Sequence, residues 1–147
     1  DLEQAFGSRL CFPKGKIVVC PGSKFCKFAV AGKDNHAMGK EVERISKAHE
    51  AGKVKVGVSC CPLGCALPRV RDLGILATAK GWTLTIGGNG GAKPGVGEVI
   101  AQDLSEEELL TLLDKVYQYF QDNKNGKERT IRTIERLGID HLKAAVL

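Results

Sequence analysis

Apolar and polar residues alternate in several short segments of this chain, a pattern typical of strands that bury one face. The clearest case is KVKVGVS at 53–59, where Val54, Val56 and Val58 share a face. The segment LGILATAKGWTLTIGG predicts a hairpin whose turn falls at Lys80 and Gly81. The whole pattern predicts strands at 16–20, 53–59, 74–79, 82–87 and 97–104.

Other segments repeat their apolar residues with helical spacing. Asp34 is a suitable N-cap for a helix that runs to about residue 49. Ser105 and Glu108 predict a capping box at the start of a helix over 106–121. The apolar stripes of these two helices consist of Met38, Val42 and Ile45, and of Leu109, Leu112, Leu113, Val116 and Phe120. Further helical segments are expected as a turn at 23–30, as a helix at 127–137 and as a last turn from Asp140.

Strands, a helix, more strands and then helices follow one another along the chain. This order predicts an α+β fold with a mixed β-sheet and helices on one side of it. The 147 residues suit one domain, and an apolar share of 43% is enough for a core. We expect an N-terminal arm at 1–16, a central domain at 17–122, and a C-terminal helical extension at 123–147 that packs on the same domain.

The sequence shows no membrane or secretion signal. Apolar runs stay well short of the ~20 residues that span a bilayer. No signal-peptide pattern opens the chain, which begins at Asp1 rather than at a methionine. We therefore expect a cytoplasmic protein without membrane contact.

Positive charge is concentrated in the first hundred residues, where 15 Lys and Arg stand against 8 Asp and Glu. A solvated surface, a nucleic-acid face and a pocket for an anionic small molecule all fit such a balance. Only 5% of the residues are aromatic, and no basic run is interleaved with aromatic side chains. Nucleic acid is therefore not expected as a partner.

Four of the six cysteines form two pairs, Cys20 with Cys26 and Cys61 with Cys65. Each pair lies in a turn rich in Pro and Gly at the end of a predicted strand, so the two loops can converge and present four thiolates. A disulfide framework is typical of small secreted domains and does not suit this chain. Such a thiolate set binds zinc or an iron–sulfur cluster. Structural zinc usually uses C-x2-C or C-x4-C pairs, and C-x5-C is wider than these, so we favour the cluster and keep zinc as the alternative.

The motifs CPGSKFCKFAV, VKVGVSCCPLGC, RVRDLGILATAKGWTLTIGGNGG and IERLGIDHLKA occur in this order from about Ile17 to Ala145. Together they resemble the sirohaem and 4Fe-4S domain of nitrite and sulfite reductases, in particular the assimilatory NADH-type nitrite reductases. The resemblance implies that Cys20, Cys26, Cys61 and Cys65 hold a 4Fe-4S cluster. It also implies that Cys65 bridges this cluster to a sirohaem.

Sirohaem carries a rim of carboxylates, so its pocket needs cations and backbone N–H groups. Beside the motifs, the resemblance makes these residues candidates for contact with sirohaem or a small anionic substrate: Lys27, Arg69, Gly88, Asn89, Gly90 and Lys93. These grounds do not identify a catalytic residue. An electron-donor protein or domain is the further partner that this chemistry requires.

The chain departs from the family in two respects. The family's full enzymes have two homologous halves with the cofactors between them, so a second copy of this chain or a partner chain is expected to supply the missing half. Cys11 and Cys60 are additional cysteines. We interpret Cys60 as a small buried hydrophobe and assign no role to Cys11. The histidines show no pairing with a nucleophile, and we interpret His49 as a surface residue.

Two functions follow as hypotheses. The first is a redox domain or subunit that binds a 4Fe-4S cluster and sirohaem and takes part in the reduction of sulfite or nitrite. The second is a non-catalytic electron-transfer module that keeps the cluster and lacks sirohaem. A zinc-stabilised binding domain is a weaker third.

Overall fold

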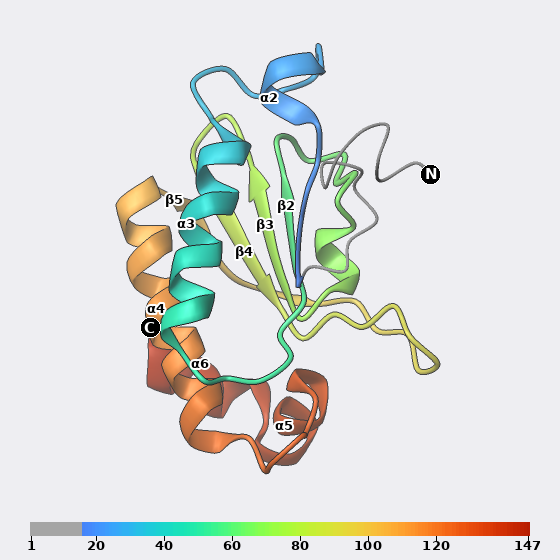
Figure 1. The fold of residues 1–147 in the computed structure, drawn as a ribbon, viewed down its shortest axis with the longest axis vertical. Helices are drawn as coiled ribbons and strands as arrows, with labels where there is room; N and C mark the ends of the chain where they lie inside the picture. The colour runs from blue at the N-terminus through green and yellow to red at the C-terminus, as the bar shows by residue number, and fades with distance from the viewer. Residues whose placement is uncertain (1–15) are drawn as a thin grey trace, which may run out of the picture.

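The computed structural model describes residues 16–147. The predicted arm, apart from Lys16, and Cys11 lie outside this range. A five-stranded sheet with the order β1-β2-β3-β4-β5 forms the centre of the molecule (Figure 1). The elements in chain order are β1 (Ile17–Val19), α2 (Gly22–Phe25), α3 (Asn35–Ala48), β2 (Val56–Ser59), η2 (Pro68–Val70), β3 (Leu73–Ala77), β4 (Trp82–Ile86), β5 (Glu98–Leu104), α4 (Glu106–Asn123), α5 (Thr130–Leu137) and α6 (Ile139–Val146).

The sheet is mixed, as predicted. The pairs β1–β2 and β2–β3 are parallel, whereas β3–β4 and β4–β5 are antiparallel. The register pairs Val19 with Val58 and Ser59 with Leu76, so β1, β2 and β3 finish at the same edge of the sheet. The predicted hairpin is β3–β4, in which Ala77 pairs with Trp82.

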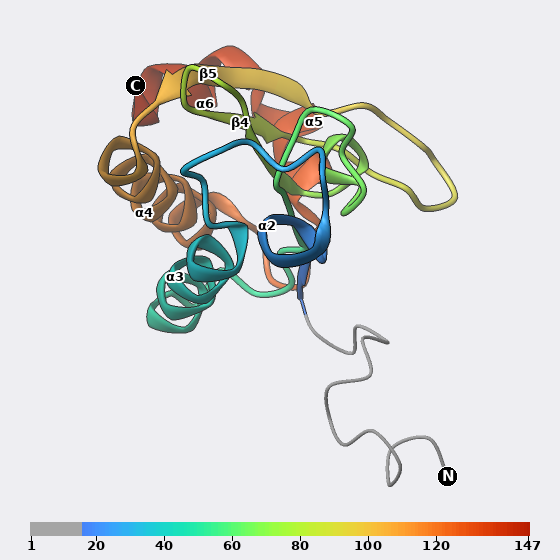
Figure 2. The same cartoon turned by 90° about the horizontal axis from the view of Figure 1, so that it is seen from above.

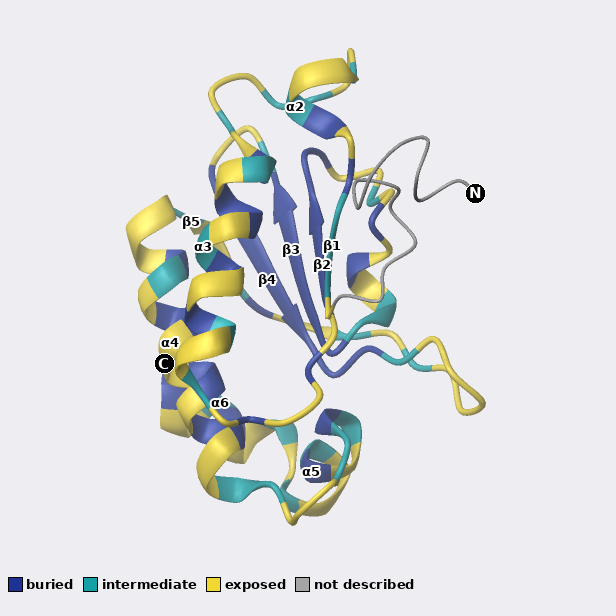
Figure 3. Cartoon of the chain, viewed as in Figure 1, coloured by how far each residue is buried: buried dark blue, intermediate teal, exposed yellow. Residues whose placement is uncertain are grey.

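Helices α3 and α4 pack side by side on one face of the sheet (Figures 1 and 2). Their predicted apolar stripes are buried and meet the valines, leucines and isoleucines of β2, β3 and β4 in one core. The outer faces of both helices are exposed, while the central strands are buried throughout (Figure 3). This division follows the amphipathic period of each helix.

The two predicted N-caps are confirmed. Asp34 accepts hydrogen bonds from the backbone N–H groups of His36 and Ala37 at 3.0 and 3.1 Å. Ser105 and Glu108 exchange the two hydrogen bonds of a capping box. Within residues 16–147, no helix is long and apolar enough to cross a membrane.

The strand β2 is buried on both faces, which differs from the one-sided burial predicted for 53–59. The segment 66–71 crosses the face opposite to α3 and includes η2, an element that the hydrophobic pattern did not predict. At Gly57 in β2, an added Cβ would lie 2.6 Å from the Ala66 carbonyl oxygen. Gly74 in β3 likewise leaves no room for a side chain beside the Pro68 carbonyl. Glycine in these strands lets a second layer of backbone pack directly on the sheet.

The last part of the chain forms two helices rather than one helix and a final turn. Gly138 ends α5, as expected, and α6 continues for eight residues and packs against α4. The boundary predicted between 122 and 123 falls in the last turn of α4.

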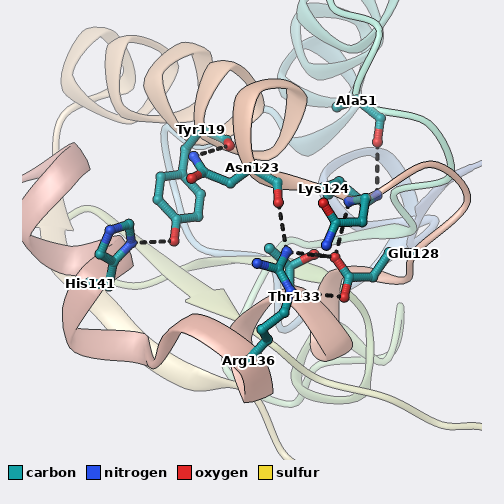
Figure 4. A network of polar contacts seen from close by, with 9 residues as sticks. Ala51, Tyr119, Asn123, Lys124, Glu128, Thr133, Arg136 and His141 are labelled. Atoms are coloured by element: carbon teal, nitrogen blue, oxygen red, sulfur yellow. Dashed lines mark hydrogen bonds and ion pairs between the residues drawn. The ribbon is translucent and has the colours of Figure 1, made fainter.

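A polar network holds α5 against the end of α4 (Figure 4). Arg136 donates to the Asn123 carbonyl at 2.7 Å and to Glu128 at 2.9 Å, and Glu128 also accepts from the Thr133 hydroxyl at 3.0 Å. The hydrogen bonds from Arg136 lower the pKa of Glu128 to about 2. The carboxylate is therefore the form that holds this end of the fold together.

Candidate metal centre

The two cysteine loops meet at the edge of the sheet where the parallel strands end. Cys20 comes directly after β1, and Cys60 and Cys61 come directly after β2. Since β1 and β2 are parallel neighbours, their following residues lie side by side, and the Cys20 N–H donates to the Val58 carbonyl at 3.0 Å. The sheet therefore brings together two loops that are about forty residues apart in the sequence.

Three of the four predicted ligands gather at this edge. Cys20, Cys60 and Cys61 are buried together in a small cluster, and the half-buried Cys26 packs against it. Cys65 is exposed and is not part of the cluster. Among residues 16–147, no three Cys, His, Asp or Glu side chains are close enough together to hold a single metal ion.

Hydrogen-bond donors point at the sulfur of Cys20. The backbone N–H of Cys60 lies 3.2 Å from the Cys20 Sγ, and the side-chain amide of Asn35 lies 3.3 Å from it. N–H donors to cysteine sulfur are among the features that set the properties of iron–sulfur sites. The donor set and its surroundings thus fit an iron–sulfur cluster.

Cys60 is buried, as its interpretation as a small hydrophobe expects. Burial, followed by the nearby thiols of Cys20 and Cys61, raises the pKa of Cys60 to about 12. Its Cβ would stand 2.6 Å from a Cβ added at Gly22, so the first cysteine loop packs directly against it. Cys60 therefore lies between the two loops as a packed neutral thiol.

The second cysteine loop is anchored on the sheet by the segment that follows it. The Ala66 N–H donates to the Ser59 hydroxyl at 3.1 Å, and the Arg71 Nε donates to the Ala66 carbonyl at 3.0 Å. Leu67, between Cys65 and η2, has a left-handed backbone with a φ of 54°. These contacts bring the chain back to the sheet directly after Cys65.

The predicted glycine loop lies at the other end of the sheet. Because β4 runs antiparallel to β3, Gly87 emerges where β3 begins, and its N–H donates to the Asp72 carbonyl at 2.9 Å (Figure 1). The five residues of β3 put roughly 13 Å between this end and the cysteine edge. Gly88, Asn89, Gly90 and Lys93 are therefore not beside Cys20 and Cys61.

The glycine loop also has structural reasons for its composition. A Cβ at Gly88 would lie 2.6 Å from the Arg71 carbonyl oxygen. The Asn89 side chain donates to the Lys93 carbonyl at 2.7 Å and accepts from the Gly91 N–H at 3.2 Å, which closes the loop. Close packing explains why residue 88 is a glycine, and the turn explains why residue 89 is an asparagine. Neither explanation requires contact with a ligand.

A cavity of about 280 Å³ adjoins this loop. Its lining includes the backbone of Gly88–Gly91 and the basic side chains of Lys55, Arg71 and Arg129. Asp72 at its base is buried and forms an ion pair with Arg129 at 2.8 Å. A larger cavity of about 620 Å³ lies between β1 and α3 and contains no predicted site residue.

The predicted cations are on the surface. Lys27 is exposed and stacks over the ring of Phe28 at 5.1 Å. Arg69 is exposed, and its carbonyl accepts from the Gly97 N–H at 2.7 Å. Lys93 is exposed at the tip of the glycine loop.

A family model described as "Nitrite and sulphite reductase 4Fe-4S domain" matches residues 14–147. The chain belongs to this family. The expected family and fold class are thereby confirmed, and the two cysteine loops are those of a 4Fe-4S domain.

The curated relatives of this 4Fe-4S domain are reductases. It is 36% identical over 132 residues to an assimilatory-type sulfite reductase of Nitratidesulfovibrio vulgaris, a match that covers 89% of this chain and 60% of the relative. It is 37% identical over 131 residues to the large subunit of an NADH nitrite reductase of Escherichia coli, covering 87% of this chain and 15% of that subunit. A nitrite reductase of Bacillus subtilis is 34% identical over 150 residues, and this match covers 99% of this chain and 18% of that reductase. The chain thus spans about 60% of the sulfite reductase and far less of the nitrite reductases.

A solved structure agrees on the fold. The NirA protein of Mycobacterium tuberculosis superposes with a TM-score of 0.68 at 22% identity, covering 86% of this chain and 26% of the other. The relatives are oxidoreductases, as expected from the motifs, and are larger proteins or subunits of larger enzymes.

Two features of this 4Fe-4S domain were missed or misjudged from the sequence. Asn35 was not singled out, and only its position beside the N-cap Asp34 and close to the first loop could have drawn attention to it. The interpretation of His49 as a surface residue is wrong, since its side chain is 10% exposed, bonds to Asp114 at 2.8 Å and stacks on Tyr117. Its place at the end of α3, facing α4, leaves the residue half-buried.

Proposed function

We propose that this chain is a redox domain or subunit that binds a 4Fe-4S cluster through Cys20, Cys26, Cys61 and Cys65, and that takes part in the reduction of sulfite or nitrite. The observation that carries the proposal is the meeting of the two cysteine loops at one edge of the sheet, with Cys20, Cys26 and Cys61 gathered there. Family membership supports the same chemistry.

The exposure of Cys65 supports a second role for this residue. A thiolate shared between a cluster and a sirohaem must contact a group that lies outside the protein core. Of the four predicted ligands, Cys65 is the exposed one, and it lies in a loop shaped by Pro62 and Gly64. We therefore assign to Cys65 the bridge to sirohaem.

The cluster supplies single electrons, and the sirohaem supplies the site at which the anion is reduced. The chain's own residues would bind and orient these groups. Arg69, Lys27 and Lys93 carry the charges that attract carboxylates or an oxyanion. Because the glycine loop lies at the far end of the sheet, Gly88, Asn89, Gly90 and Lys93 would contact the outer edge of a large cofactor rather than the cluster.

Sulfite and nitrite are both candidate substrates, because the chain is 36% identical to the assimilatory-type sulfite reductase and 37% identical to the nitrite reductase large subunit. A second copy of this chain or a partner chain would complete the sirohaem pocket. A cytoplasmic location agrees with this chemistry and stays a prediction.

The surface outside Cys26 suits an acidic electron-donor protein. Phe25 and Phe28 are 81% and 58% exposed on either side of Cys26. Lys24 and Lys27 alternate with them, and no acidic residue occurs between 21 and 33. Exposed aromatic rings among cations of one sign are typical of a surface that meets a partner of opposite charge.

The donor surface can be tested with a charge-reversed variant. Lys24→Glu should raise the KM for an acidic ferredoxin and weaken its salt dependence, while reduction by dithionite stays unchanged. Lys127→Glu, a reversal at an exposed site in the linker before α5, is the control. Equal KM values in all three proteins would remove this surface from the proposal.

The function itself is tested by purifying the protein without oxygen and recording its spectrum, with iron, sulfide and zinc assayed on the same sample. Haem bands with roughly five irons and four sulfides per chain, four of the irons from the cluster and one from the sirohaem, would establish both cofactors, and sulfite and nitrite turnover would follow. A cluster without haem would favour the alternative, a non-catalytic electron-transfer module. Stoichiometric zinc without sulfide would refute the proposal.

The ligand assignment is tested by two serine variants of neighbouring cysteines. Cys65→Ser should abolish sirohaem retention and damage the cluster. Cys60→Ser should leave both nearly intact, because Cys60 is assigned to packing alone. If Cys60→Ser empties the site while Cys61→Ser does not, the ligand register is wrong by one residue.

A further inference from the structure

The amide of Asn35 is directed entirely at the first cysteine loop. Asn35 is the first residue of α3 and is fully buried. Its Oδ1 accepts from the Ser23 N–H at 3.0 Å, and its Nδ2 donates to the Cys20 carbonyl at 2.8 Å. The same Nδ2 lies 3.3 Å from the Cys20 Sγ. One side chain therefore binds the backbone on both sides of Pro21–Gly22 and reaches the sulfur as well.

The orientation of this amide follows from its partners. The Ser23 N–H can only donate, so it requires the oxygen of Asn35. The Cys20 carbonyl can only accept, so it requires the nitrogen. An amide nitrogen has two hydrogens, and the second one is available for the sulfur.

The packing around Asn35 leaves the amide no other position. A Cβ added at Gly22 would lie 2.7 Å from both polar atoms of the Asn35 side chain and 2.6 Å from the Cys60 Cβ. Asp34, the preceding residue, caps α3 and so fixes the backbone from which Asn35 extends. The N–H that points at Cys20 is therefore held in place before any cofactor binds.

We propose that Asn35 is a positioning residue that orients the Cys20 thiolate and raises the reduction potential of the cluster; this rests on the proposed function. Reduction adds negative charge, part of which resides on the sulfur atoms. An N–H donor to a ligand sulfur stabilises the reduced form more than the oxidised form, which raises the potential. The backbone N–H of Cys60 acts on the same sulfur and cannot be removed by a side-chain substitution.

The test is a redox titration of the anaerobically purified protein, followed by electron paramagnetic resonance. Asn35→Asp has nearly the same shape and keeps the acceptor for Ser23, but it replaces the donor with an oxygen. Asn35→Ser removes the donor without adding charge. For Asn35→Ser, we expect the ratio of oxidised to reduced cluster at a fixed solution potential to rise about tenfold, which corresponds to 59 mV for a one-electron couple. We expect a larger shift for Asn35→Asp.

Asn123→Ser is the matched control. Asn123 also donates from its amide to a backbone carbonyl, that of Tyr119 at 2.8 Å, but at the end of α4 and far from the cysteines (Figure 4). This variant should lose stability and keep the wild-type potential. A purely structural role for Asn35 would lower cluster occupancy in its variants and leave the potential of the retained cluster unchanged, which would overturn the proposal.

Wild-type protein decides the question if both Asn35 variants fail to keep a cluster. With ¹⁵N-labelled asparagine, the reduced cluster should show a hyperfine coupling to ¹⁵N, because Asn35 is the asparagine next to a predicted ligand. No coupling would overturn the proposal. A wild-type protein with no iron or sulfide would instead refute the proposed function, and the two failures are therefore distinguishable.

Discussion

Alanine at Gly57 should separate the second cysteine loop from the sheet on which it packs. The added methyl would lie 2.6 Å from the Ala66 carbonyl oxygen and 3.0 Å from the Pro68 Cα. Ordinary van der Waals contact begins at 3.4 Å, so the facing backbone has to move by about 0.8 Å. Gly57 pairs with Gly74 in the middle of the sheet, so the strand cannot yield instead.

The energetic cost can be bounded from this geometry. Overpacking of a well-packed interior typically costs about 1–3 kcal/mol. Replacing glycine with alanine also restores about 0.4–1 kcal/mol of stability, because alanine lowers the conformational entropy of the unfolded chain. We therefore expect a net loss of about 1–2 kcal/mol in the free energy of unfolding and a lower yield of assembled cluster, because the displaced backbone also carries Cys61 and Cys65.

Urea denaturation of the metal-free protein measures the first effect, with a midpoint lowered by roughly 1 M at an unchanged slope. Iron and sulfide per chain measure the second. Gly95→Ala is the control, since a Cβ there meets nothing within 4 Å and the backbone is not left-handed. If Gly57→Ala unfolds within about 0.5 kcal/mol of Gly95→Ala, the contact between segment 66–71 and β2 does not stabilise the fold as argued.

Three further predictions concern single residues. Leu67→Asn should stabilise the protein by up to about 1 kcal/mol in thermal or urea unfolding, because asparagine tolerates the left-handed backbone better than leucine; a loss of stability would contradict this. Glu128→Gln should be less stable than wild type above pH 4.5, the ordinary pKa of this carboxyl. The difference should disappear as the pH falls to about 2, the folded-state pKa, because stability from a lowered pKa is lost on protonation; a difference that persists at pH 2 would argue against the ion pair with Arg136. Lys93→Glu should lower sirohaem retention while sulfide content and stability stay at wild-type values, and an unchanged haem content would remove Lys93 from the cofactor edge.

The local sequence was enough to predict where the cysteines meet. It was not enough to predict where the glycine loop lies relative to them. A strand pattern followed by a cysteine in a Pro–Gly turn occurs twice, and parallel pairing of β1 with β2 was enough to bring Cys20 and Cys61 together. The glycine loop was expected near the same cofactor, yet the antiparallel direction of β4 carries it to the other end of the sheet. The predicted hairpin already implied that β4 returns toward the start of β3, but the parallel pairing of β3 with β2, which places that start away from the cysteine edge, was not predicted.

Asn35 and His49 show why individual roles were harder to predict. Both are polar residues at the ends of α3, where capping and solvation are ordinary explanations. Asn35 is buried because α3 begins against the first cysteine loop, and His49 is half-buried because α3 ends against α4. The burial of each residue depends on which element packs next to its end of α3. The apolar periodicity within the helix does not show which element that is.

The sequence by itself determined the strands, the two main helices with their caps, and the pairing of the cysteines into two strand-end loops. These features follow from local periodicity, capping chemistry and spacing, which act within a few residues. Only the tertiary structure decided that segment 66–71 covers the second face of β2 and β3, that Cys65 stays exposed, and that Asn35 reaches Cys20. These depend on close approaches between distant segments, for which Gly57 and Gly74 in the strand interiors were the only local trace.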